Sequence, residues 1–502
     1  MINHTREQLS CSKFTAVMDA GNGWSALIGT LNAGIVYLRN GLCSSLVSFM
    51  RQPRLATELR AWLQFSQGLP GHEADDVVAA LKAEKILTTP EDDSQVPSMI
   101  RRVAGQRRFK LRVMYLLLSD TCNLACTYCT VRHNTNIRGS VHGLMQPDVI
   151  DSALRLAKEI REPMTPLQIT FFGGEPLLNR FGFLYALRRI REWFEPEGVH
   201  LSLVTNGTLL DTELSRAVAE HTVFPIVSVD GPPNIHNQAR VTKVSSGSYA
   251  NTLRGVQMLQ QRGVAVGASI LVAQHNALVL PRVVEHLVCD VGVLNLGFSL
   301  PHVEPAGLEP PTPDLIAALL AGWVKARSLG TYVVQVGTRL CAFVERRLRL
   351  NGCIGSDSGW GMLRVLPNGT LTTCENMGLR GLSILGHVQE SAIASRLFVH
   401  PELQQWVQRG QHRFKSCLGC IGFVACGAGC TYDAFLETGD MMQPEIRNCC
   451  FTQDLIRWAV RDLAQHSLSP VKTPYCYPGP QMRAQILGTT LERLQSHPFF
   501  AL

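Results

Sequence analysis

The sequence predicts an α/β protein built around a partial barrel of six β/α units, with a winged-helix-like N-terminal module and a cysteine-rich C-terminal domain. Three observations lead to this prediction. The chain has 502 residues, too many for one small core. Short apolar runs alternate with helical patterns between residues 111 and 300. Of 16 cysteines, 13 fall between Cys122 and Cys450.

Residues 1 to 108 are predicted to form a separate small module. Alternating segments at 14–20, 24–31 and 34–40 are typical of short strands, and the Gly-Asn-Gly sequence at 21–23 is expected to be a turn. Helical spacing follows at 55–63 and again at 75–84. Strands followed by helices indicate a winged-helix-like unit. The polar stretch 89–98, which contains prolines and precedes two arginine pairs, is expected to be a linker.

Six apolar and nearly uncharged runs are candidate buried parallel strands. They are 113–119, 167–172, 201–205, 225–230, 264–272 and 291–300. Helical stretches supply the crossovers that parallel strands need, at 148–160, 183–193, 212–220, 249–262 and 281–288. The chemistry of such a barrel lies at the C-terminal ends of its strands. A proline-rich loop and a helix at 314–328 follow, and we place the end of this domain at residue 335.

Charge and apolar patterning exclude several classes of protein. The composition is 46% hydrophobic and 17% charged, which fits a globular chain and not a disordered one. The 47 Lys and Arg residues exceed the 40 Asp and Glu residues but are spread along the chain, so nucleic acid is not expected as a partner. The N-terminus lacks a signal-peptide core, and no apolar run has the length of a membrane span. We therefore expect a cytoplasmic protein, in which closely spaced cysteines indicate metal or iron–sulfur ligation.

The first cysteine motif comes directly after the first barrel strand. Cys122, Cys126 and Cys129 form a CxxxCxxC loop at the expected catalytic end. Three thiolates can hold three irons of a [4Fe–4S] cluster and leave the fourth iron open to a chelating molecule. Structural zinc normally has four protein ligands, so a zinc site here would need a further ligand from elsewhere; this alternative stays open.

Polar segments follow the next strands in order. They are FGGEP at 172–176, VTNG at 204–207, SVDGP at 228–232 and IHNQAR at 235–240. Each is weak alone, because a Gly-Gly-Glu turn is common between a strand and a helix and a lone arginine is most often a surface charge. Together with the cysteine loop, the segments resemble the radical S-adenosylmethionine (SAM) superfamily.

The resemblance implies a binding site for S-adenosyl-L-methionine. The turn of Gly173, Gly174 and Glu175 would bind the ammonium group of the methionyl moiety. Arg240 would pair with its carboxylate. The other residues expected to line the cofactor are Thr205, Asn206, Ser228 and Asp230.

A second set of cysteines follows the barrel and resembles the SPASM domain. Cys353 and Cys374 stand in the pattern C-x15-G-x4-C, and the segment 417–430 reads C-x2-C-x5-C-x3-C, with a Cys-Cys pair at 449–450. This domain extends radical SAM enzymes that modify peptides and proteins, and it binds two auxiliary [4Fe–4S] clusters. The implied fold is a partial (β/α)6 TIM-type radical SAM barrel over 109–335, a SPASM Fe–S domain over 336–466 and a tail over 467–502. A pair of zinc ribbons is the alternative.

Family analogy also implies a partition of the ligands among three [4Fe–4S] clusters, one that binds SAM and two that are auxiliary. The first auxiliary cluster would take Cys341, Cys353, Cys374 and Cys430, and the second Cys417, Cys420, Cys426 and Cys449. Cys341 is equally compatible with an ordinary buried thiol, which would leave the first auxiliary cluster open to substrate or water. Cys449 is preferred to Cys450 because apolar residues follow at 455–456. Cys11, Cys43, Cys289 and Cys476 are expected to be ordinary thiols.

Glu375 is the candidate catalytic base. It follows Cys374, and in sulfatase-maturating enzymes an aspartate at the equivalent place acts as a base near the first auxiliary cluster. A carboxylate that only accepts backbone hydrogen bonds is the alternative. Asp357 is a second, weaker candidate. Three histidines are interpreted as having no functional role: His133, His142 and His236.

The resemblance implies an oxidoreductase that reductively cleaves SAM to a 5′-deoxyadenosyl radical. In its pattern, the N-terminal module resembles the RiPP recognition element, which adds a leader peptide as a strand to a sheet edge; a structural cap on the barrel is the alternative. We therefore predict oxidative cross-linking of side chains in a ribosomally synthesised precursor peptide, with a flavodoxin or ferredoxin as electron donor. Two alternatives remain. One is maturation of a protein, either a sulfatase by formylglycine formation or an enzyme subunit by thioether cross-linking. The other is a non-catalytic Fe–S or zinc-binding scaffold.

Overall fold

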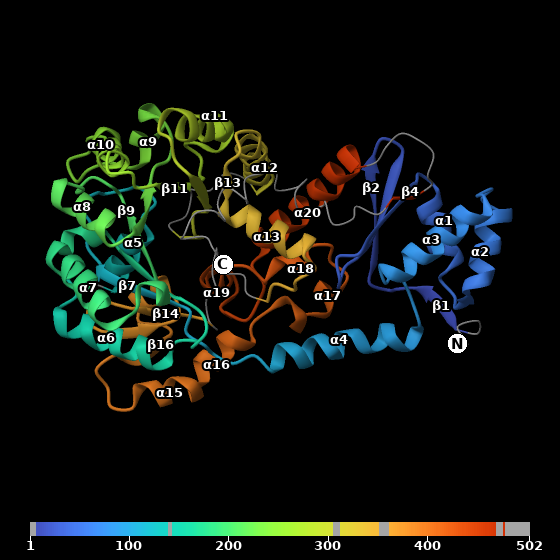
Figure 1. The fold of residues 1–502 in the computed structure, drawn as a ribbon, viewed down its shortest axis with the longest axis horizontal. Coiled ribbons are helices and arrows are strands. Elements are labelled where there is room, and N and C mark those ends of the chain that lie inside the picture. The colour runs from blue at the N-terminus through green and yellow to red at the C-terminus, as the bar shows by residue number, and fades with distance from the viewer. Residues whose placement is uncertain (1–6, 139–142, 305–311, 351–360, 468–474, 477–502) are drawn as a thin grey trace.

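The computed structural model describes residues 7–138, 143–304, 312–350, 361–467 and 475–476 (Figure 1). The barrel lies at one end of an elongated molecule and the N-terminal lobe at the other, with the cysteine-rich domain between them. None of the helices in these ranges is both long enough and apolar enough to cross a membrane.

Six parallel strands form the barrel sheet and lie side by side in chain order, which confirms the predicted fold class. Three consecutive leucines of the first strand, at 116–118, are each 0% exposed, so both faces of the strand are covered, as in parallel sheets packed between layers. The strands are β7 (Val113–Ser119), β8 (Leu167–Gly173), β9 (Val199–Thr205), β10 (Val223–Ser228), β11 (Gly267–Leu271) and β12 (Asn295–Ser299). The helices are α5 (Thr130–Arg138), α6 (Pro147–Ile160), α7 (Arg180–Trp193), α8 (Thr212–Glu220), α9 (Pro233–Ala239), α10 (Tyr249–Gln260), α11 (Leu280–Glu285) and α12 (Thr312–Ser328).

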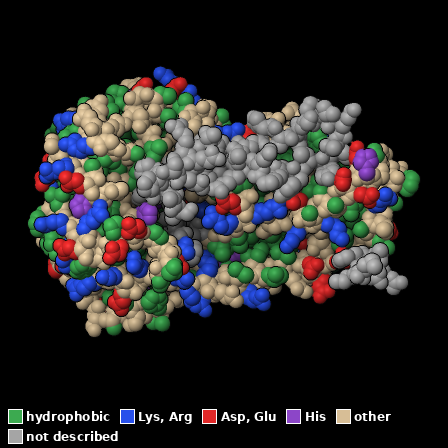
Figure 2. Space-filling view, in the orientation of Figure 1, with side chains coloured by type: hydrophobic (Ala, Val, Ile, Leu, Met, Phe, Trp, Pro, Cys, Tyr) green, Lys and Arg blue, Asp and Glu red, His purple; other side chains and the backbone are tan. Residues whose placement is uncertain are grey.

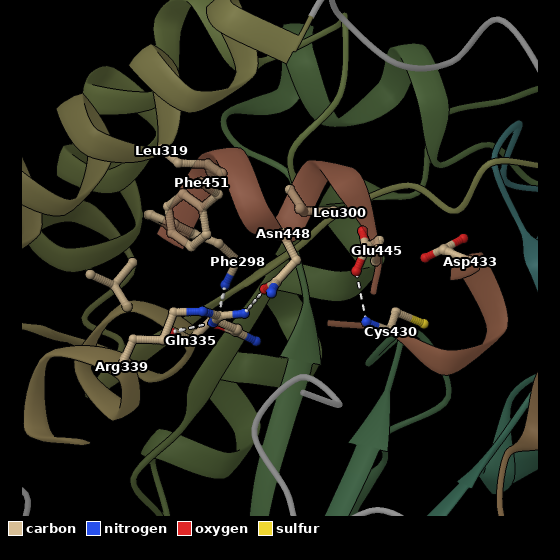
Figure 3. Close-up of a pocket in the computed structure, with 11 residues that line it drawn as sticks. Phe298, Leu300, Leu319, Gln335, Arg339, Cys430, Asp433, Glu445, Asn448 and Phe451 are labelled. Carbon is tan, nitrogen blue, oxygen red and sulfur yellow. Dashed lines mark hydrogen bonds between the residues drawn. The ribbon is translucent and has the colours of Figure 1, made fainter. Parts of the chain in front are cut away.

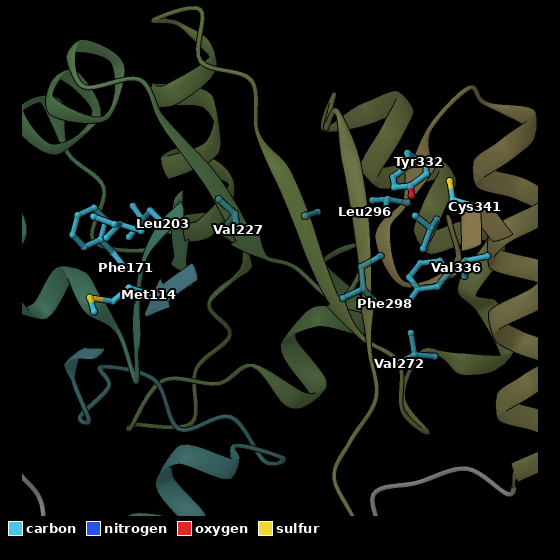
Figure 4. Close-up of a cluster of buried hydrophobic side chains, with 14 of the residues drawn as sticks. Met114, Phe171, Leu203, Val227, Val272, Leu296, Phe298, Tyr332, Val336 and Cys341 are labelled. Carbon is cyan, nitrogen blue, oxygen red and sulfur yellow. The ribbon is translucent and has the colours of Figure 1, made fainter. Parts of the chain in front are cut away.

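The barrel sheet continues into the C-terminal domain. Next to β7 lies the parallel strand β14 (Met362–Val365), followed by the antiparallel strands β15 (Thr370–Thr372) and β16 (Ile384–His387). Beyond β12 the sheet ends with β13 (Tyr332–Val333). The main apolar core likewise runs from the barrel strands to α13 (Val334–Val344), as Figure 4 shows for part of it. The two domains therefore share one sheet and one core.

Short helices make up most of the cysteine-rich domain, where the sequence shows little periodicity. They are α14 (Glu375–Leu379), α15 (Ile393–Val399), α16 (Pro401–Gln408), α17 (Lys415–Leu418), α18 (Phe423–Cys426) and α19 (Thr431–Thr438), followed by the long α20 (Ile446–Ser467). Helices of four to eight residues span too few turns for an amphipathic pattern to appear.

The N-terminal lobe is a sheet held between two layers of helix. Its antiparallel strands are β2 (Thr15–Gly21), β3 (Trp24–Gly29) and β4 (Ile35–Arg39). Val36 and Leu38 pack on α1 (Leu42–Phe49), α2 (Ala56–Phe65) and α3 (Gly71–Ala83). On the opposite face Tyr37 joins the main core and donates a hydrogen bond to the carbonyl of Val460 in α20 (2.7 Å). The lobe is thus packed against the C-terminal helix.

Two further small pairings complete the lobe. Strand β1 (Gln8–Cys11) lies between β5 (Arg54–Leu55) and β6 (Leu87–Thr88). At the outer edge of the main sheet, β17 (Tyr475–Cys476) pairs antiparallel with β4, with Tyr475 opposite Leu38. A segment of the C-terminal tail therefore occupies the edge of the N-terminal sheet.

The predicted linker over residues 89–98 is wrong, because α4 (Pro90–Gly105) occupies this stretch. Thr89 caps the helix by accepting a hydrogen bond from the N–H of Asp92 (3.1 Å). Pro90 is at the first helical position, and acidic residues fill the first turn. The polar composition belongs to an exposed helix that runs from the N-terminal lobe toward the barrel (Figure 1).

Candidate active site

The loop that carries Cys122, Cys126 and Cys129 lies at the C-terminal end of β7 and is fixed by backbone hydrogen bonds. The N–H of Ala125 donates to the carbonyl of Val241 (2.7 Å), and that of Thr127 donates to Ala239 (3.0 Å). These bonds attach the cysteine loop to the segment after α9, which carries Arg240. Backbone hydrogen bonds therefore hold the cysteine loop in place, in addition to any group that its thiols bind.

The three thiols form a donor set that fits an iron–sulfur cluster. Burial raises the pKa of Cys122 to about 12 and that of Cys126 to about 11, and the neighbouring thiol of Cys129 contributes to both increases. The N–H of Leu124 donates to Cys122 Sγ (3.3 Å), and that of Arg132 to Cys129 Sγ (3.4 Å). Three half-buried thiols placed this close together are suited to bind a cationic centre as thiolates, because its positive charge would stabilise their negative charges.

The glycine turn after β8 brings that strand close to the cysteine loop. Gly173 has a φ of +143°, and a Cβ on it would lie 2.0 Å from the carbonyl oxygen of Ser119; on Gly174 the distance to Thr121 O would be 2.3 Å. The N–H of Gly174 donates to Ser119 O (2.8 Å), and that of Glu175 donates to Thr121 O (2.9 Å). Only residues without a side chain allow this approach. The turn thus supports the base of the cysteine loop.

Glu175 connects β8 to β9 through a fully buried carboxylate, which is 0% exposed. It accepts hydrogen bonds from Thr205 Oγ1 (2.7 Å), the N–H of Asn206 (2.8 Å) and the N–H of Leu177 (3.1 Å). Burial raises the pKa of Glu175 to about 7. The Asn206 side chain in turn lies 3.7 Å from Cys122 Sγ. Three of the predicted cofactor residues are therefore brought together beside the cysteine loop.

Asp230, just beyond β10, is the centre of a second buried group. Its carboxylate pairs with Arg240 Nε (3.0 Å) and His275 Nε2 (3.3 Å), and it accepts hydrogen bonds from the Tyr128 hydroxyl and the N–H of Leu271 (3.0 Å). Burial alone would raise the pKa of Asp230, but Arg240 and His275 outweigh it and hold that pKa well below its usual range. Asp230 thus fixes Arg240 against the ring of Tyr128.

The remaining predictions around this group have mixed outcomes. Ser228 is the last residue of β10 and lies half-buried, in register with Ser269 of β11. His236 was interpreted as having no role, yet it is 0% exposed and accepts a hydrogen bond from the N–H of Asp230 (3.4 Å). Burial lowers the pKa of His236 to about 3, so it is neutral. His133 faces Glu304 (3.3 Å), and His142 lies outside the described residues.

The four C-terminal cysteines assigned from the sequence to a second auxiliary cluster lie close together, and their role as ligands stays a prediction. Cys426 and Cys449 interact directly, which lowers the pKa of Cys426 and raises that of Cys449, and Cys417 and Cys420 raise the pKa of Cys449 further. The side chain of Asn448 donates to Cys426 Sγ (3.2 Å). Cys449, and not its neighbour in sequence, therefore lies with the other three thiols.

The first auxiliary set is described only in part. Cys374 and Cys430 belong to one apolar cluster, and each directly precedes a helix, α14 and α19. Cys341 lies in α13, 7% exposed, in the main core near Tyr332 (Figure 4). Cys353 and Asp357 lie outside the described residues. The assignment of Cys341 as a ligand stays a prediction, because its surroundings also suit an ordinary buried thiol.

Glu375 forms an ion pair with Arg364 of β14. Its side chain is 19% exposed, whereas that of Arg364 is 6% exposed and lies over the ring of Tyr115. The role of Glu375 as a base stays a prediction.

Sequence reasoning missed a chain of hydrogen bonds between the two cysteine regions. Tyr432 Oη donates to Asn134 Oδ1 (3.0 Å), and Asn134 Nδ2 donates to Asn376 Oδ1 (3.1 Å). Asn376 Nδ2 lies 3.0 Å from His302 Nε2, and His302 Nδ1 lies 2.9 Å from Asp433 Oδ2. Four of the five residues follow a predicted cysteine ligand within five positions, which is the only sequence signal they carry.

A small cavity lies beside Cys430 where the barrel meets the C-terminal domain (Figure 3). Glu445 accepts a hydrogen bond there from the N–H of Cys430 (2.7 Å), and burial together with Asp433 raises the pKa of Glu445 to about 8. The cavity volume of about 30 Å³ holds a water molecule or two but no substrate.

Comparison with known proteins agrees with this geometry. The profile of the radical SAM superfamily matches residues 116–282, which include the cysteine loop, the glycine turn and Arg240. This chain contains a radical SAM domain. It is therefore an enzyme that uses SAM and a [4Fe–4S] cluster.

Its relatives include maturases of two kinds. The serine-type anaerobic sulfatase-maturating enzyme of Klebsiella aerogenes is 24% identical over 371 residues, which cover 70% of this chain and 84% of that enzyme. The radical SAM cyclopropyl synthase TigE of Paramaledivibacter caminithermalis is 23% identical over 273 residues, which cover 51% of this chain and 55% of that enzyme.

Solved structures share the fold. The enzyme anSMEcpe with bound AdoMet aligns at a TM-score of 0.59 and 19% identity, over 70% of this chain and 99% of that one. Streptococcus suis SuiB bound to precursor peptide SuiA aligns at a TM-score of 0.52 and 12% identity, over 88% of this chain and 99% of that one.

Proposed function

We propose that this radical SAM enzyme oxidatively cross-links side chains of a ribosomally synthesised precursor peptide. The N-terminal lobe is the observation that carries the proposal. SuiB, which was solved with a precursor peptide, overlaps 88% of this chain, whereas anSMEcpe overlaps 70%. The larger overlap is what a shared N-terminal lobe would give, and it supports a peptide-binding role for that lobe.

The outer edge of β4 is the proposed binding site for the leader peptide. This edge pairs with β17 in antiparallel register, Leu38 opposite Tyr475 and Tyr37 opposite Cys476. A leader peptide would add to the same edge as a strand and would displace β17, since main-chain hydrogen bonds carry such recognition. The helices α1 to α3 cover one face of the sheet, and the edge of β4 already accepts an added strand, β17.

The residues at the barrel strand ends prepare the SAM site. Bound SAM and its cluster supply the 5′-deoxyadenosyl radical that removes a hydrogen atom from the substrate. Cys122, Cys126 and Cys129 would hold that cluster. Asp230 fixes the guanidinium of Arg240, which would then pair with the methionyl carboxylate.

Glu375 would take the proton that leaves the substrate, and its ion pair with Arg364 would hold the carboxylate in position. We further propose two auxiliary [4Fe–4S] clusters. The second would be held by Cys417, Cys420, Cys426 and Cys449, and the first by Cys374 and Cys430 together with Cys341 and Cys353.

The test uses the full chain, because deleting the N-terminal lobe would expose the face of α20 that the lobe covers. The reconstituted enzyme is incubated with SAM, dithionite and a short peptide encoded beside its gene. We expect about twelve irons per chain, 5′-deoxyadenosine and a peptide that has lost two hydrogen atoms. Hydrogen exchange at residues 35–39 should change when the peptide binds. Release of 5′-deoxyadenosine without any change in the peptide's mass or in this exchange would contradict the proposal.

A protein maturase is the second candidate, favoured by the similarity that covers 84% of the Klebsiella aerogenes enzyme. A sulfatase-derived peptide with a serine or cysteine target tests it. Formylglycine in that peptide, seen as an aldehyde that reacts with hydrazines, would favour this function over cross-linking.

A further inference from the structure

We propose that an acidic electron-carrier protein docks on the face formed by the end of α4, the turn Gln411–Arg413 and α17. We call this surface the basic face. The inference rests on the proposed function, because it takes the second auxiliary cluster at Cys417, Cys420, Cys426 and Cys449 as the nearest redox group. It adds to that function a place and a chemistry for the electron-carrier partner.

The basic face is defined by its charge. Residues 98–110 and 409–420 contain eight Lys and Arg residues and no Asp or Glu. Six of them are exposed: Arg101, Arg102, Arg108, Lys110, Arg413 and Lys415. Lys110 is paired with Glu162 (2.8 Å). Figure 2 shows Lys and Arg side chains along the middle of the molecule, where α4 approaches the cysteine-rich domain.

The two sequence segments meet in space, so their charges add. Helix α4 contacts the turn Gln411–Arg413. Burial and the nearby charges of Arg107, Arg413 and Arg101 together lower the pKa of His412 to about 4. Arg107 is held by a hydrogen bond to the carbonyl of Leu350 (3.2 Å). The acidic residues of α4 lie in its first turn, at the opposite end of the helix. The end near the cysteines therefore carries mainly positive charge, with Asp440 near Arg413 as an acidic exception.

An apolar strip adjoins these charges. Met99 and Val103, one turn apart on α4, are 54% and 59% exposed. Transient redox partners use small interfaces, and charge at the rim steers their encounter. Two exposed apolar side chains beside a ring of cations suit a partner with an acidic rim and an apolar centre.

The basic face leads directly to the proposed cluster ligands. Lys415 and Cys417 share α17, and the thiols of Cys417 and Cys420 are half-buried near the surface. A further cation lies deeper in the domain, where Arg349 donates a hydrogen bond to the carbonyl of Cys426 (3.0 Å). A carrier seated here would hold its redox centre over this cluster. One electron would leave the reduced carrier, which is oxidised, and enter the enzyme.

The experiment compares two variants of the full-length holoenzyme with equal change in net charge. The docking variant carries Arg101→Glu, Arg413→Glu and Lys415→Glu. The control variant reverses three exposed charges on the barrel helices, Arg155→Glu, Arg188→Glu and Arg216→Glu. The probe is a reduced flavodoxin of net negative charge. Its dissociation constant is measured by fluorescence anisotropy at low and high salt, and enzyme reduction is followed by bleaching of iron–sulfur absorbance.

We expect the docking variant to bind the flavodoxin about tenfold more weakly and to be reduced correspondingly more slowly, because reversal of rim charges acts on association. High salt should weaken binding to the unaltered enzyme. The control variant should change by less than about twofold. Both variants should release 5′-deoxyadenosine with dithionite at the unaltered rate, which shows that they are folded and loaded.

Equal binding and reduction of the two variants would overturn the proposal. So would a docking variant that loses affinity for the precursor peptide but not for the flavodoxin, since the basic face would then be a peptide site. A failure of the proposed function is distinguishable, because the unaltered enzyme, with no mutation, would then leave the precursor peptide unmodified. A failure of the cluster assignment is distinguishable as well, because the unaltered enzyme would then lack the iron of the second auxiliary cluster.

Discussion

The two cysteine regions of this enzyme hold the same kind of ligand in opposite electrical surroundings. The catalytic loop at Cys122–Cys129 lies beside two buried carboxylates, Glu175 and Asp230, with Arg240 as the nearby cation. The C-terminal set around Cys426 lies beside Arg339 and Arg349. The catalytic loop is also fixed by backbone hydrogen bonds to neighbouring segments, whereas the C-terminal ligands lie on or next to short helices.

This difference indicates a division of labour. Negative charge near a cluster disfavours its reduced form and lowers the reduction potential, whereas positive charge does the reverse. A cluster that must pass an electron to SAM benefits from the first environment, and one that receives an electron benefits from the second. We therefore expect the catalytic cluster to have the lower potential, and the following predictions test this contrast.

The largest effect is expected from Cys126→Ala. Loss of one of the three proposed ligands should remove the catalytic cluster and lower 5′-deoxyadenosine release by more than about 10³-fold, because this loop is proposed to supply every protein ligand of that cluster. Liquid chromatography of the nucleoside product measures it. Cys289→Ala, at an exposed thiol near the end of α11, is the matched control and should leave 5′-deoxyadenosine release unchanged. If Cys126→Ala released 5′-deoxyadenosine at the unaltered rate, the comparison between a catalytic and a C-terminal cysteine region would have no basis.

Gly174→Ala should come next, because its new Cβ would lie 2.3 Å from the carbonyl oxygen of Thr121, in rigid backbone. We expect a loss of stability of about 1–3 kcal/mol from this overpacking, and partial loss of catalytic iron. Calorimetry and iron analysis measure both. Gly105→Ala, where an added Cβ meets nothing within 4 Å, is the control. Equal behaviour of the two variants would show that the catalytic loop does not depend on its backbone support.

The sequence predicted the barrel strands and the strand-end motifs well, because uncharged runs and short motifs are local signals. It failed at α4, where the polar stretch of 89–98 has the composition of a linker although Thr89 and Pro90 are a helix start. It could not reveal the contact between Asn134 and Asn376, since these residues are 242 positions apart and meet only through the shared sheet. Nor could spacing alone decide between Cys449 and Cys450, which only the helix phase of α20 separates.

Cys449→Ala and Cys450→Ala form a pair that tests the C-terminal side of the comparison. The first change should remove about four of about twelve irons and leave SAM cleavage intact, since the catalytic loop is independent of it. The second should leave the iron content unchanged, because Cys450 packs against the main apolar core. Iron analysis and electron paramagnetic resonance distinguish them. Iron loss from Cys450→Ala alone would reverse the ligand assignment.

The smallest effect is a shift of potential at the second auxiliary cluster in Arg339→Met. Burial lowers the pKa of Arg339 to about 9, so its guanidinium is still charged at neutral pH. Removing that charge should lower the potential by about 50 mV, since about 59 mV corresponds to a tenfold change for a one-electron couple. Redox titration followed by electron paramagnetic resonance measures the shift.

Two variants separate charge from packing in this titration. Arg339→Lys retains the positive charge but loses the planar guanidinium that reaches Asn448 and Thr452. If charge is the cause of the shift, the reduction potential of this variant should lie close to that of the unaltered enzyme. Arg155→Met removes an exposed cation on the barrel and should leave the potential unchanged. A shift of equal size in the lysine and methionine variants would mean that packing around the cluster, and not the charge of Arg339, sets its potential. The electrostatic contrast between the two cysteine regions would then lose its functional meaning.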